Sequence, residues 1–328
     1  MSVLLVVTLL LVLGAEFVNG LTDAANAIAT VVSTRVLSPG KAVIMAAVFN
    51  LLGVLVTGTA VATTIGKGIV DPEIVTVEVV AAAMLTIVVW STAAWRFGIP
   101  TSETHELVAG LAGAGLASAG PSVLLWDGWR KVLIGLGMST LIGFGLGLAI
   151  MVAIYWLFHR APRGHTTLFF GKMQILSAAF MAFSHGSNDG QKFMGVFSLA
   201  LFLAGVFPTF HVPFWVILLC GSVMAFGTAL GGWRIIRTMG ARITRLEPVH
   251  GFAAETAAST AILLASRFGI PLSTTHTIGT AIMGVGASKR LTAVNWSVSG
   301  NVVKTWLITF PVCLALGYVF TWLFTLIF

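Results

Sequence analysis

Long runs of apolar residues, each about as long as a membrane is thick, recur along the chain. A helix needs about 20 mostly apolar residues to cross a bilayer. Such runs span, among others, residues 2–19, 42–62, 77–95, 131–158, 213–233 and 305–328. They lack the alternation of a membrane barrel, and lipid requires backbone groups to be satisfied within a segment. The pattern therefore predicts an all-α polytopic membrane protein.

Two polar segments interrupt this pattern in duplicate. Residues 96–105 (RFGIPTSETH) and 267–276 (RFGIPLSTTH) share eight of ten positions at an offset of 171. Residues 19–23 and 185–189 form a second pair, which shares Gly and Asp at an offset of 166. A duplicated architecture follows. We divide the chain into a first repeat (1–159), a short cytoplasmic linker (160–171) and a second repeat (172–328).

The two repeats are expected to have inverted topology. If 78–120 and 250–288 are re-entrant hairpins, each half has three crossings, an odd number. Broken helices in inverted repeats are typical of secondary transporters. Both termini then lie outside the cell, in a multi-pass protein of the cell membrane. Only three basic residues fall on the outside: Lys67, Arg130 and Lys131. Eleven fall on the cytoplasmic side, as the positive-inside rule requires: Arg35, Lys41, Arg160, Arg163, Lys172, Arg234, Arg237, Arg242, Arg245, Lys289 and Arg290. Treating 78–96 as a full crossing would place Arg160 and Arg163 outside.

Composition supports this assignment and excludes others. Charged residues make up 9% of the chain, against about 25% in soluble domains. The net charge of +7 is explained by basic loops, and no soluble domain is present to bind nucleic acid. The first residues lack the basic start and cleavage site of a signal peptide. Cys220 and Cys313 lie in apolar runs, so we expect no disulfide, metal site or cofactor.

The two hairpin tips are candidate anion sites. Gly-Ile-Pro interrupts a helix, because proline lacks an N–H and restricts the residue before it. Hydroxyls then fall near the start of a new helix, where free N–H groups favour anions. Ordinary helix capping is the alternative interpretation. The candidate substrate-binding residues are the hydroxyls of Ser102, Thr104, Ser273, Thr274 and Thr275, together with Glu103 and Gln191.

A second set of polar residues precedes the tips. Ionisable residues inside membrane segments are costly and usually functional. Carboxylates and amides are ligands that sodium needs, and aspartates can also carry protons. The candidate coupling-ion residues are Asp23, Asn26, Asn188 and Asp189, with Gln191 and Lys192 close by. A structural Asp189–Lys192 salt bridge is the alternative.

Three further side chains have open roles. Glu103 stands in the first tip, where it is protonated, faces away, or binds a cation with the substrate. Hydrogen phosphate can donate a hydrogen bond to such a carboxylate, whereas sulfate cannot. His185 and Glu255 are candidate proton carriers, as auxiliary groups together with Lys192; a polar contact between small-residue helices is the alternative for Glu255.

At these residues the sequence resembles the inorganic phosphate transporter (Pit) family over essentially the whole chain. The family signatures G-x-N-D-x-A-N-A and G-x-N-D-x-Q-K appear at residues 20–27 and 186–192, and its P-x-S-T-T-H tips appear at 100–105 and 271–276. The resemblance implies a symporter that holds phosphate between the tips. When the binding residues of the family are carried over position by position, the resemblance implies that Asp23, Asn26, Asn188 and Asp189 bind the coupling ion. The five tip hydroxyls would bind the anion, and Gln191 would lie near either ion.

The sequence departs from the family pattern at two site positions. Thr22 replaces the Asn before Asp in sodium-coupled members, and Glu103 replaces a tip threonine. The coupling ion is therefore left open between Na+ and H+. A sulfate permease is the alternative function. An anion channel fits paired broken helices less well, and the symmetric duplication of Ser and His argues against an enzyme. A homodimer is possible.

Overall fold

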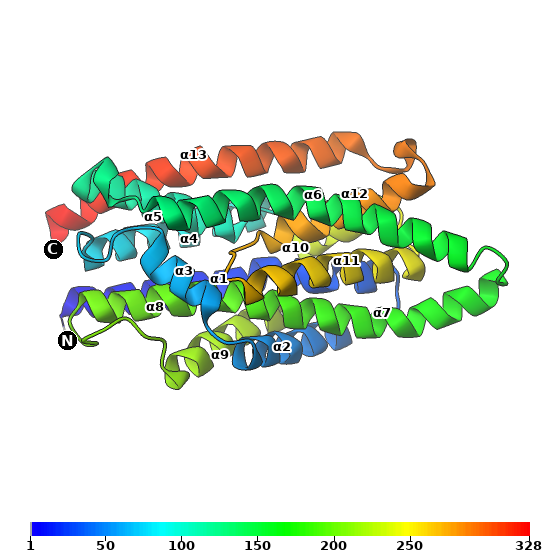
Figure 1. The fold of residues 1–328 in the computed structure, drawn as a ribbon, viewed down its shortest axis with the longest axis horizontal. Coiled ribbons are helices and arrows are strands. Elements are labelled where there is room, and N and C mark those ends of the chain that lie inside the picture. Colours follow the sequence, from blue (N-terminus) through cyan, green and yellow to red (C-terminus); the bar gives the residue numbers. More distant parts are fainter. Residues whose placement is uncertain (1) are drawn as a thin grey trace.

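The computed structural model describes residues 2–328, and within them every regular element is a helix (Figure 1). The first half contains α1 (Val3–Ser33), α2 (Pro39–Val56), α3 (Ala60–Gly68), α4 (Val77–Phe97), α5 (Glu103–Ala119) and α6 (Trp126–Leu157). The second half contains α7 (Arg163–His185), a π-helical turn (Gly186–Gly190), α8 (Gln191–Leu203), α9 (Phe214–Leu230), α10 (Trp233–Arg237), a second π-helical turn (Thr238–Arg242), α11 (Pro248–Arg267), α12 (Thr274–Lys289) and α13 (Trp296–Ile327).

The two halves repeat one design in opposite directions. The helix α1 corresponds to α7 with α8, α2 to α9, α3 to α10, the hairpin α4–α5 to α11–α12, and α6 to α13. In Figure 1, α6 and α13 run antiparallel, and both chain ends lie at the left-hand end. The all-α fold with two inverted repeats is thereby confirmed. The helix α7 begins at Arg163, inside the stretch that the sequence suggested as a linker.

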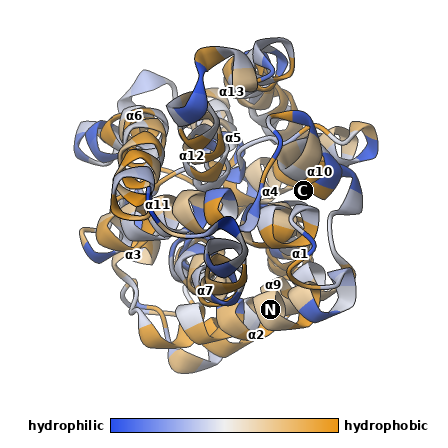
Figure 2. Ribbon diagram, turned by 90° about the vertical axis from the view of Figure 1, so that its right-hand side faces the viewer, coloured by the Kyte–Doolittle hydropathy of each residue, from blue (hydrophilic) through white to orange (hydrophobic). Residues whose placement is uncertain are grey.

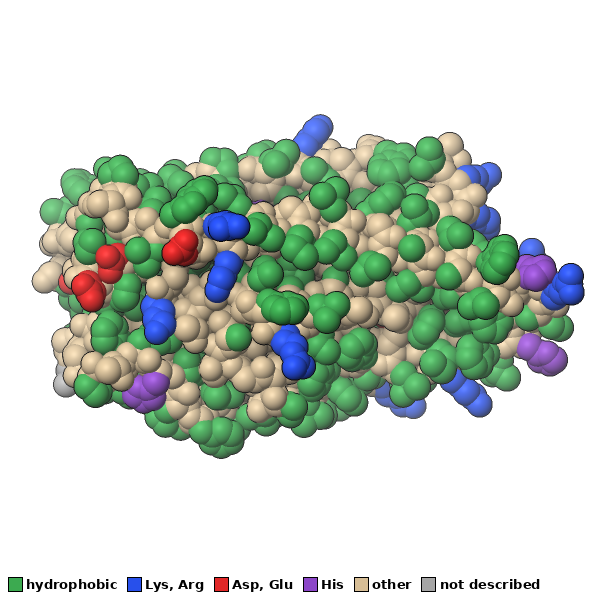
Figure 3. Space-filling view, in the orientation of Figure 1, with side chains coloured by type: hydrophobic (Ala, Val, Ile, Leu, Met, Phe, Trp, Pro, Cys, Tyr) green, Lys and Arg blue, Asp and Glu red, His purple; other side chains and the backbone are tan. Residues whose placement is uncertain are grey.

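Within residues 2–328, six helical runs are long and apolar enough to cross a membrane, one of them the continuous run of α7 and α8 (Arg163–Leu203). A seventh span arises if α9 is joined to the bent segment that follows it. One of the six, α4, turns back through a tip into α5. Large hydrophobic side chains are exposed along the outer helices. The ribbon of α2 is mostly orange in Figure 2, the colour of hydrophobic residues. Hydrophobic side chains are spread over the whole face in Figure 3, and acidic and basic side chains are scattered over its left-hand part. The right-hand end, where α6 and α7 join, carries Lys, Arg and His side chains.

The hairpin tips form where the sequence breaks the helices. The helices α4 and α11 end before Gly98 (φ 68°) and Gly269 (φ 65°), a backbone conformation that favours glycine. Each glycine carbonyl accepts a hydrogen bond from the other half. Thr64 donates to Gly269 O and Thr238 donates to Gly98 O, both at 2.8 Å. These matched contacts fix the second tip to α3 and the first tip to the π-helical turn Thr238–Arg242.

Each tip helix packs against the last helix of the opposite repeat. The helix α5 lies along α13, and α12 lies along α6. Glycines allow the backbones to approach closely, as in other membrane bundles. A Cβ on Gly113 would lie 1.9 Å from Leu314 O, and one on Gly284 would lie 2.2 Å from Phe144 O. The two repeats therefore interlock, which brings both tips to the middle of the molecule.

Candidate functional site

The two tips touch each other through their capping serines. The Oγ atoms of Ser102 and Ser273 lie 2.8 Å apart. Each serine also caps its own helix by accepting from the backbone N–H of His105 (3.4 Å) or His276 (3.2 Å). The N-termini of α5 and α12 therefore face one shared point. The rings of His105 and His276 contact each other in a tilted arrangement, with centroids 4.5 Å apart and 40° between the ring planes.

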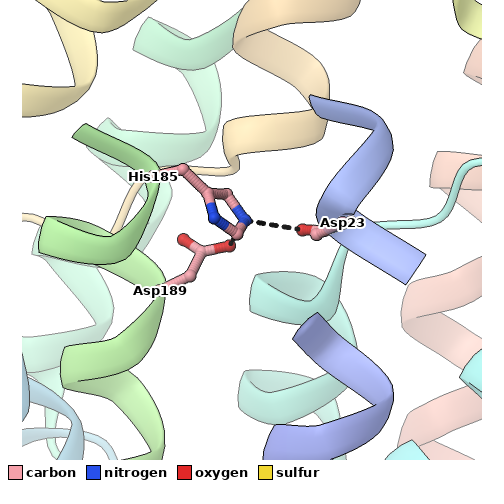
Figure 4. Close-up of side chains that lie close together, drawn as sticks. All are labelled: Asp23, His185 and Asp189. Atoms are coloured by element: carbon pink, nitrogen blue, oxygen red, sulfur yellow. Dashed lines mark ion pairs between the residues drawn. The ribbon is translucent and has the colours of Figure 1, made fainter. Parts of the chain in front are cut away.

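A titratable centre lies beside the tips, where α1 meets the π-helical turn (Figure 4). The turn directs Asp189 towards His185, whose Nε2 lies 3.4 Å from Asp189 Oδ2 and 3.7 Å from Asp23 Oδ2. One ligand atom from each of these three residues lies within 4.8 Å of the others. All three are buried. The arrangement has the size and chemistry of a small cation site.

The Lys192 ammonium is bound by three oxygen atoms and is completely buried. It donates to Asp189 Oδ1 (2.5 Å), to Thr104 Oγ1 (2.6 Å) and to Leu272 O (3.1 Å). The Asp189–Lys192 salt bridge, which was the alternative interpretation of these residues, is therefore present. Because Thr104 and Leu272 belong to opposite tips, the lysine also places a positive charge between the two tips.

Asn26 takes the equivalent place in the first half, 166 residues earlier than Lys192. Its Nδ2 donates to Thr274 Oγ1 (3.2 Å) and Thr275 Oγ1 (3.0 Å) in the second tip. Thr274 also contacts Asp189 Oδ2 (2.9 Å), and Thr275 contacts Asp23 Oδ1 (3.3 Å). The tip hydroxyls and the aspartates thus form one continuous polar network.

Three predicted site residues have side chains that contact neither the tip hydroxyls nor the centre formed by Asp23, His185 and Asp189. Gln191 accepts from Val61 N (2.8 Å), at the start of α3, and donates to Ser187 O (2.6 Å). Asn188 donates to Ser266 Oγ (2.9 Å), on the outer side of the second tip. Glu255 is held by Thr30, Ser177 and Gln174. All three are buried, but these contacts are with the scaffold around the tips.

Two functional candidates were missed by the sequence reasoning. Glu106 is fully buried on α5 and contacts Ser91 on α4. Asn50 on α2 bonds His185 Nδ1 through its Oδ1 (3.1 Å) and so orients the imidazole. The signal for Glu106 was available, because an ionisable residue in a helix of small apolar residues is costly unless it has a role.

Both faces of the site are closed. The tip hydroxyls Ser102, Ser273, Thr274 and Thr275 are each 1% exposed, and Asp189 is also 1% exposed. A solute can reach these side chains only if surrounding helices move. Such movement is what alternating access between two sides of a membrane requires.

Inverted repeats whose broken helices and hairpin tips meet inside an apolar bundle define the architecture of a secondary transporter. Comparison with known proteins gives the family. The model of the phosphate transporter family matches residues 19–169 and again residues 159–317, one match for each repeat. The chain belongs to the phosphate transporter family. Its members are transporters, so the expectation that the protein is not an enzyme is confirmed, as is the resemblance seen in the motifs.

Relatives match along nearly the full chain. A protein of Rhizobium meliloti (strain 1021), named a probable low-affinity inorganic phosphate transporter, is 48% identical over 90% of this chain and 89% of its own. One of the same name from Bacillus subtilis (strain 168) is 39% identical over 100% of both chains. A solved structure titled "The sodium-dependent phosphate transporter" covers 100% of both chains with a TM-score of 0.84 and 27% identity.

Proposed function

We propose that the protein carries inorganic phosphate across the membrane together with a cation, by alternating access. The observation that carries this proposal is the meeting of two helix N-termini and their serines, Ser102 and Ser273, at one buried point. Membership of the phosphate transporter family and the names of the relatives support the substrate. The inverted repeats support a transporter rather than a channel.

Phosphate is proposed to bind between the tips. Its oxygens would replace the direct Ser102–Ser273 contact, and each serine would then bond a phosphate oxygen. Free N–H groups at two helix starts stabilise an anion. Lys192 adds a positive charge at Thr104, while Thr274 and Thr275 are already oriented by Asn26. Gln191, whose side chain holds the start of α3, would support the site indirectly.

The coupling cation is proposed to bind at Asp23 and Asp189. Their carboxylates approach a shared imidazole and the hydroxyls of the second tip, so a charge bound there would be felt by the tip that holds the anion. Oxygen ligands suit sodium, and the structural relative named as sodium-dependent supports that ion. Protonation of the same carboxylates is the alternative. Asn188 would hold the second tip in place for either ion.

The orientation is proposed to have both termini outside. Arg160 and Arg163 lie at the turn from α6 into α7, at the end opposite to the two termini. Basic residues favour the cytoplasmic side. A cysteine introduced after Phe328, labelled by an impermeant reagent in intact cells, would test this placement.

The function is tested by radiolabelled phosphate uptake into proteoliposomes, driven by an imposed sodium gradient or an imposed proton gradient. We expect saturable accumulation that excess phosphate competes and sulfate does not. The gradient that drives accumulation names the ion. Absence of phosphate uptake, or equal competition by sulfate, would move the assignment to a sulfate permease. Uptake that never exceeds the external concentration would indicate a channel.

Removing either capping hydroxyl is expected to weaken phosphate binding. A hydrogen bond to a charged group contributes about 1.5–3 kcal/mol. Ser102→Ala and Ser273→Ala should therefore each raise the KM for phosphate by about tenfold or more, at similar protein yield. Ser122→Ala is the matched control, because Ser122 is exposed in the loop after α5. An unchanged KM in both tip variants would contradict phosphate binding between the serines.

A further inference from the structure

An apolar groove runs along α7 near the turn that joins the two repeats. It has a volume of about 710 Å³ and lies between α7, the segment after α1 and the start of α11. Leu168, Gly171 and Ile175, which recur on one face of α7, form much of its lining. Leu168 and Ile175 are exposed, so the groove opens towards the surroundings of the bundle. A hydrocarbon chain fits such a lining.

A polar cavity continues the groove at the end nearest the turn. It also has a volume of about 710 Å³, and Arg163, Thr167 and Pro248 line both spaces. The cavity lies between the end of α6 and the starts of α7 and α11, and His159 and Lys289 add further basic side chains to its lining. An apolar groove that joins a polar cavity with a basic lining suits an amphipathic ligand whose head is an anion.

The basic side chains along this path have no acidic partner in the chain. Every ion pair within residues 2–328 lies in the buried centre of the candidate site, so Arg163, Lys172 and Lys289 take part in none. The acid that lines the cavity, Glu247, forms a capping box with His250 at the start of α11. Uncompensated positive charge at a membrane surface attracts the headgroups of anionic lipids.

The junction between the groove and the cavity lies at the depth expected for lipid headgroups. Tyr155 and Trp156 stand near the end of α6, and such aromatic residues are enriched where a membrane meets water. From Arg163 onwards α7 runs back into the bundle and exposes Leu168 along the way. Lys172 lines the groove further along, and its long apolar stem allows the ammonium to reach towards the interface.

The room in the groove is not needed for packing within the chain. A Cβ added at Gly164 or Gly171 would have no atom of residues 2–328 within 4 Å, other than those of its own helix and its chain neighbours. The corresponding position in the first repeat, 166 residues before Gly171, is Leu5, which is 2% exposed. The first repeat therefore has a buried leucine side chain where the second repeat leaves open space beside two unpaired cations.

We propose that an anionic phospholipid binds in this groove, with its phosphate at Arg163 and one acyl chain along Leu168, Gly171 and Ile175. The polar cavity receives the rest of the headgroup, and Lys172 supplies a second positive charge. The bound lipid contacts the end of α6, the start of α7 and the start of α11. It therefore joins parts of both repeats and supports the hairpin that carries the second tip. This site is separate from the tips, and its assignment does not depend on the transported substrate.

The proposal is tested by native mass spectrometry of the full-length protein in detergent, titrated with phosphatidylglycerol or phosphatidylcholine. We expect each chain to retain one phosphatidylglycerol and to bind phosphatidylcholine at least about tenfold more weakly. A basic side chain beside an anionic lipid contributes about fivefold in affinity. Arg163→Gln combined with Lys172→Gln should therefore weaken the binding of phosphatidylglycerol about thirtyfold. Each single variant, expected to lose about fivefold, serves if the double variant does not fold.

A matched variant distinguishes a defined site from a generally basic surface. Arg160→Gln combined with Lys41→Gln removes the same charge from exposed positions that do not line the groove. We expect this protein to bind phosphatidylglycerol as the unmodified protein does. A loss equal to that of the Arg163→Gln, Lys172→Gln protein would overturn the proposal.

Filling the groove tests the place of the acyl chain. Gly171→Leu introduces the residue of the first repeat into open space, so the protein should fold normally. Each buried methylene contributes about 0.8 kcal/mol, and displacement of only two should weaken phosphatidylglycerol binding by about tenfold or more. Gly137→Leu, on α6, is the control, because its Cβ also meets open space and Gly137 does not line the groove.

The same spectra distinguish the other possible occupants. Displacement of the lipid by millimolar inorganic phosphate would mean that the basic cavity binds free phosphate. A dimer that Gly171→Leu converts to a monomer, with lipid binding unchanged, would mean that a second copy of this chain covers the groove. Equal binding of phosphatidylcholine would mean that the charge of the headgroup is not recognised. Each of these results would overturn the proposal, and none requires a transport assay.

Discussion

Replacing Asp189 with asparagine is expected to lower coupled phosphate uptake by at least about a hundredfold, the rate equivalent of about 3 kcal/mol. Asp189 accepts from Lys192 and Thr274 and lies 3.4 Å from His185. The neutral amide leaves the buried ammonium without its counter-ion and removes a carboxylate from the proposed cation site. Uptake and the thermal unfolding midpoint should both fall, as measured in proteoliposomes and in detergent.

A double variant separates the two consequences. Asp189→Asn with Lys192→Met removes both charges, so the folded protein no longer contains an unpaired ion. We expect the unfolding midpoint to recover while uptake stays lost. Asp127→Asn, at the exposed start of α6, is the matched control. Recovery of coupled uptake in the double variant would show that the pair has only a structural role.

Replacing Gly113 with valine is expected to prevent assembly of the two repeats. Its Cβ would lie 1.9 Å from the backbone oxygen of Leu314, which no side-chain rotation can relieve. Overpacking usually costs about 1–3 kcal/mol, and a clash with backbone places this substitution at or above the upper end of that range. The yield of monodisperse protein in detergent should fall to near zero.

The inverted repeat supplies a second copy of this test. Gly284→Val should behave in the same way, because its Cβ would lie 2.2 Å from Phe144 O on α6. Gly137→Val is the control, since nothing lies within 4 Å of a Cβ added at that position. Normal yields for Gly113→Val and Gly284→Val would mean that the tip helices do not pack closely on α13 and α6.

Local sequence alone was enough to predict the two hairpins. Gly-Ile-Pro cannot continue a helix, and a serine two residues after proline caps the next one, so the break at each tip is set within a few residues. The capping contacts of Ser102 and Ser273 agree with this. The inverted arrangement of the repeats could also be predicted. It depends on the number of apolar runs between the two copies of one motif, because an odd number of crossings reverses the orientation of the second copy.

The partners of the polar side chains could not be predicted in this way. The sequence offered a pairing of Lys192 with Asp189, three residues away, as an alternative interpretation, but its contact with Thr104 joins residues 88 apart. Asn26 reaches across 249 residues to Thr275. Gln191 has the motif of a site residue, yet its side chain binds the start of α3. The spacing of these residues along the chain does not predict contacts between residues so far apart in the sequence.

The sequence by itself determined that the chain is a membrane protein of two inverted repeats with paired polar tips, because membrane crossing, helix breaking and capping are governed by neighbouring residues. Only the tertiary structure decided which tip faces which aspartate, and that Glu103 and Glu106 share Ser91. Those contacts depend on how α1, α4 and α5 pack against one another, which no local pattern of residues specifies.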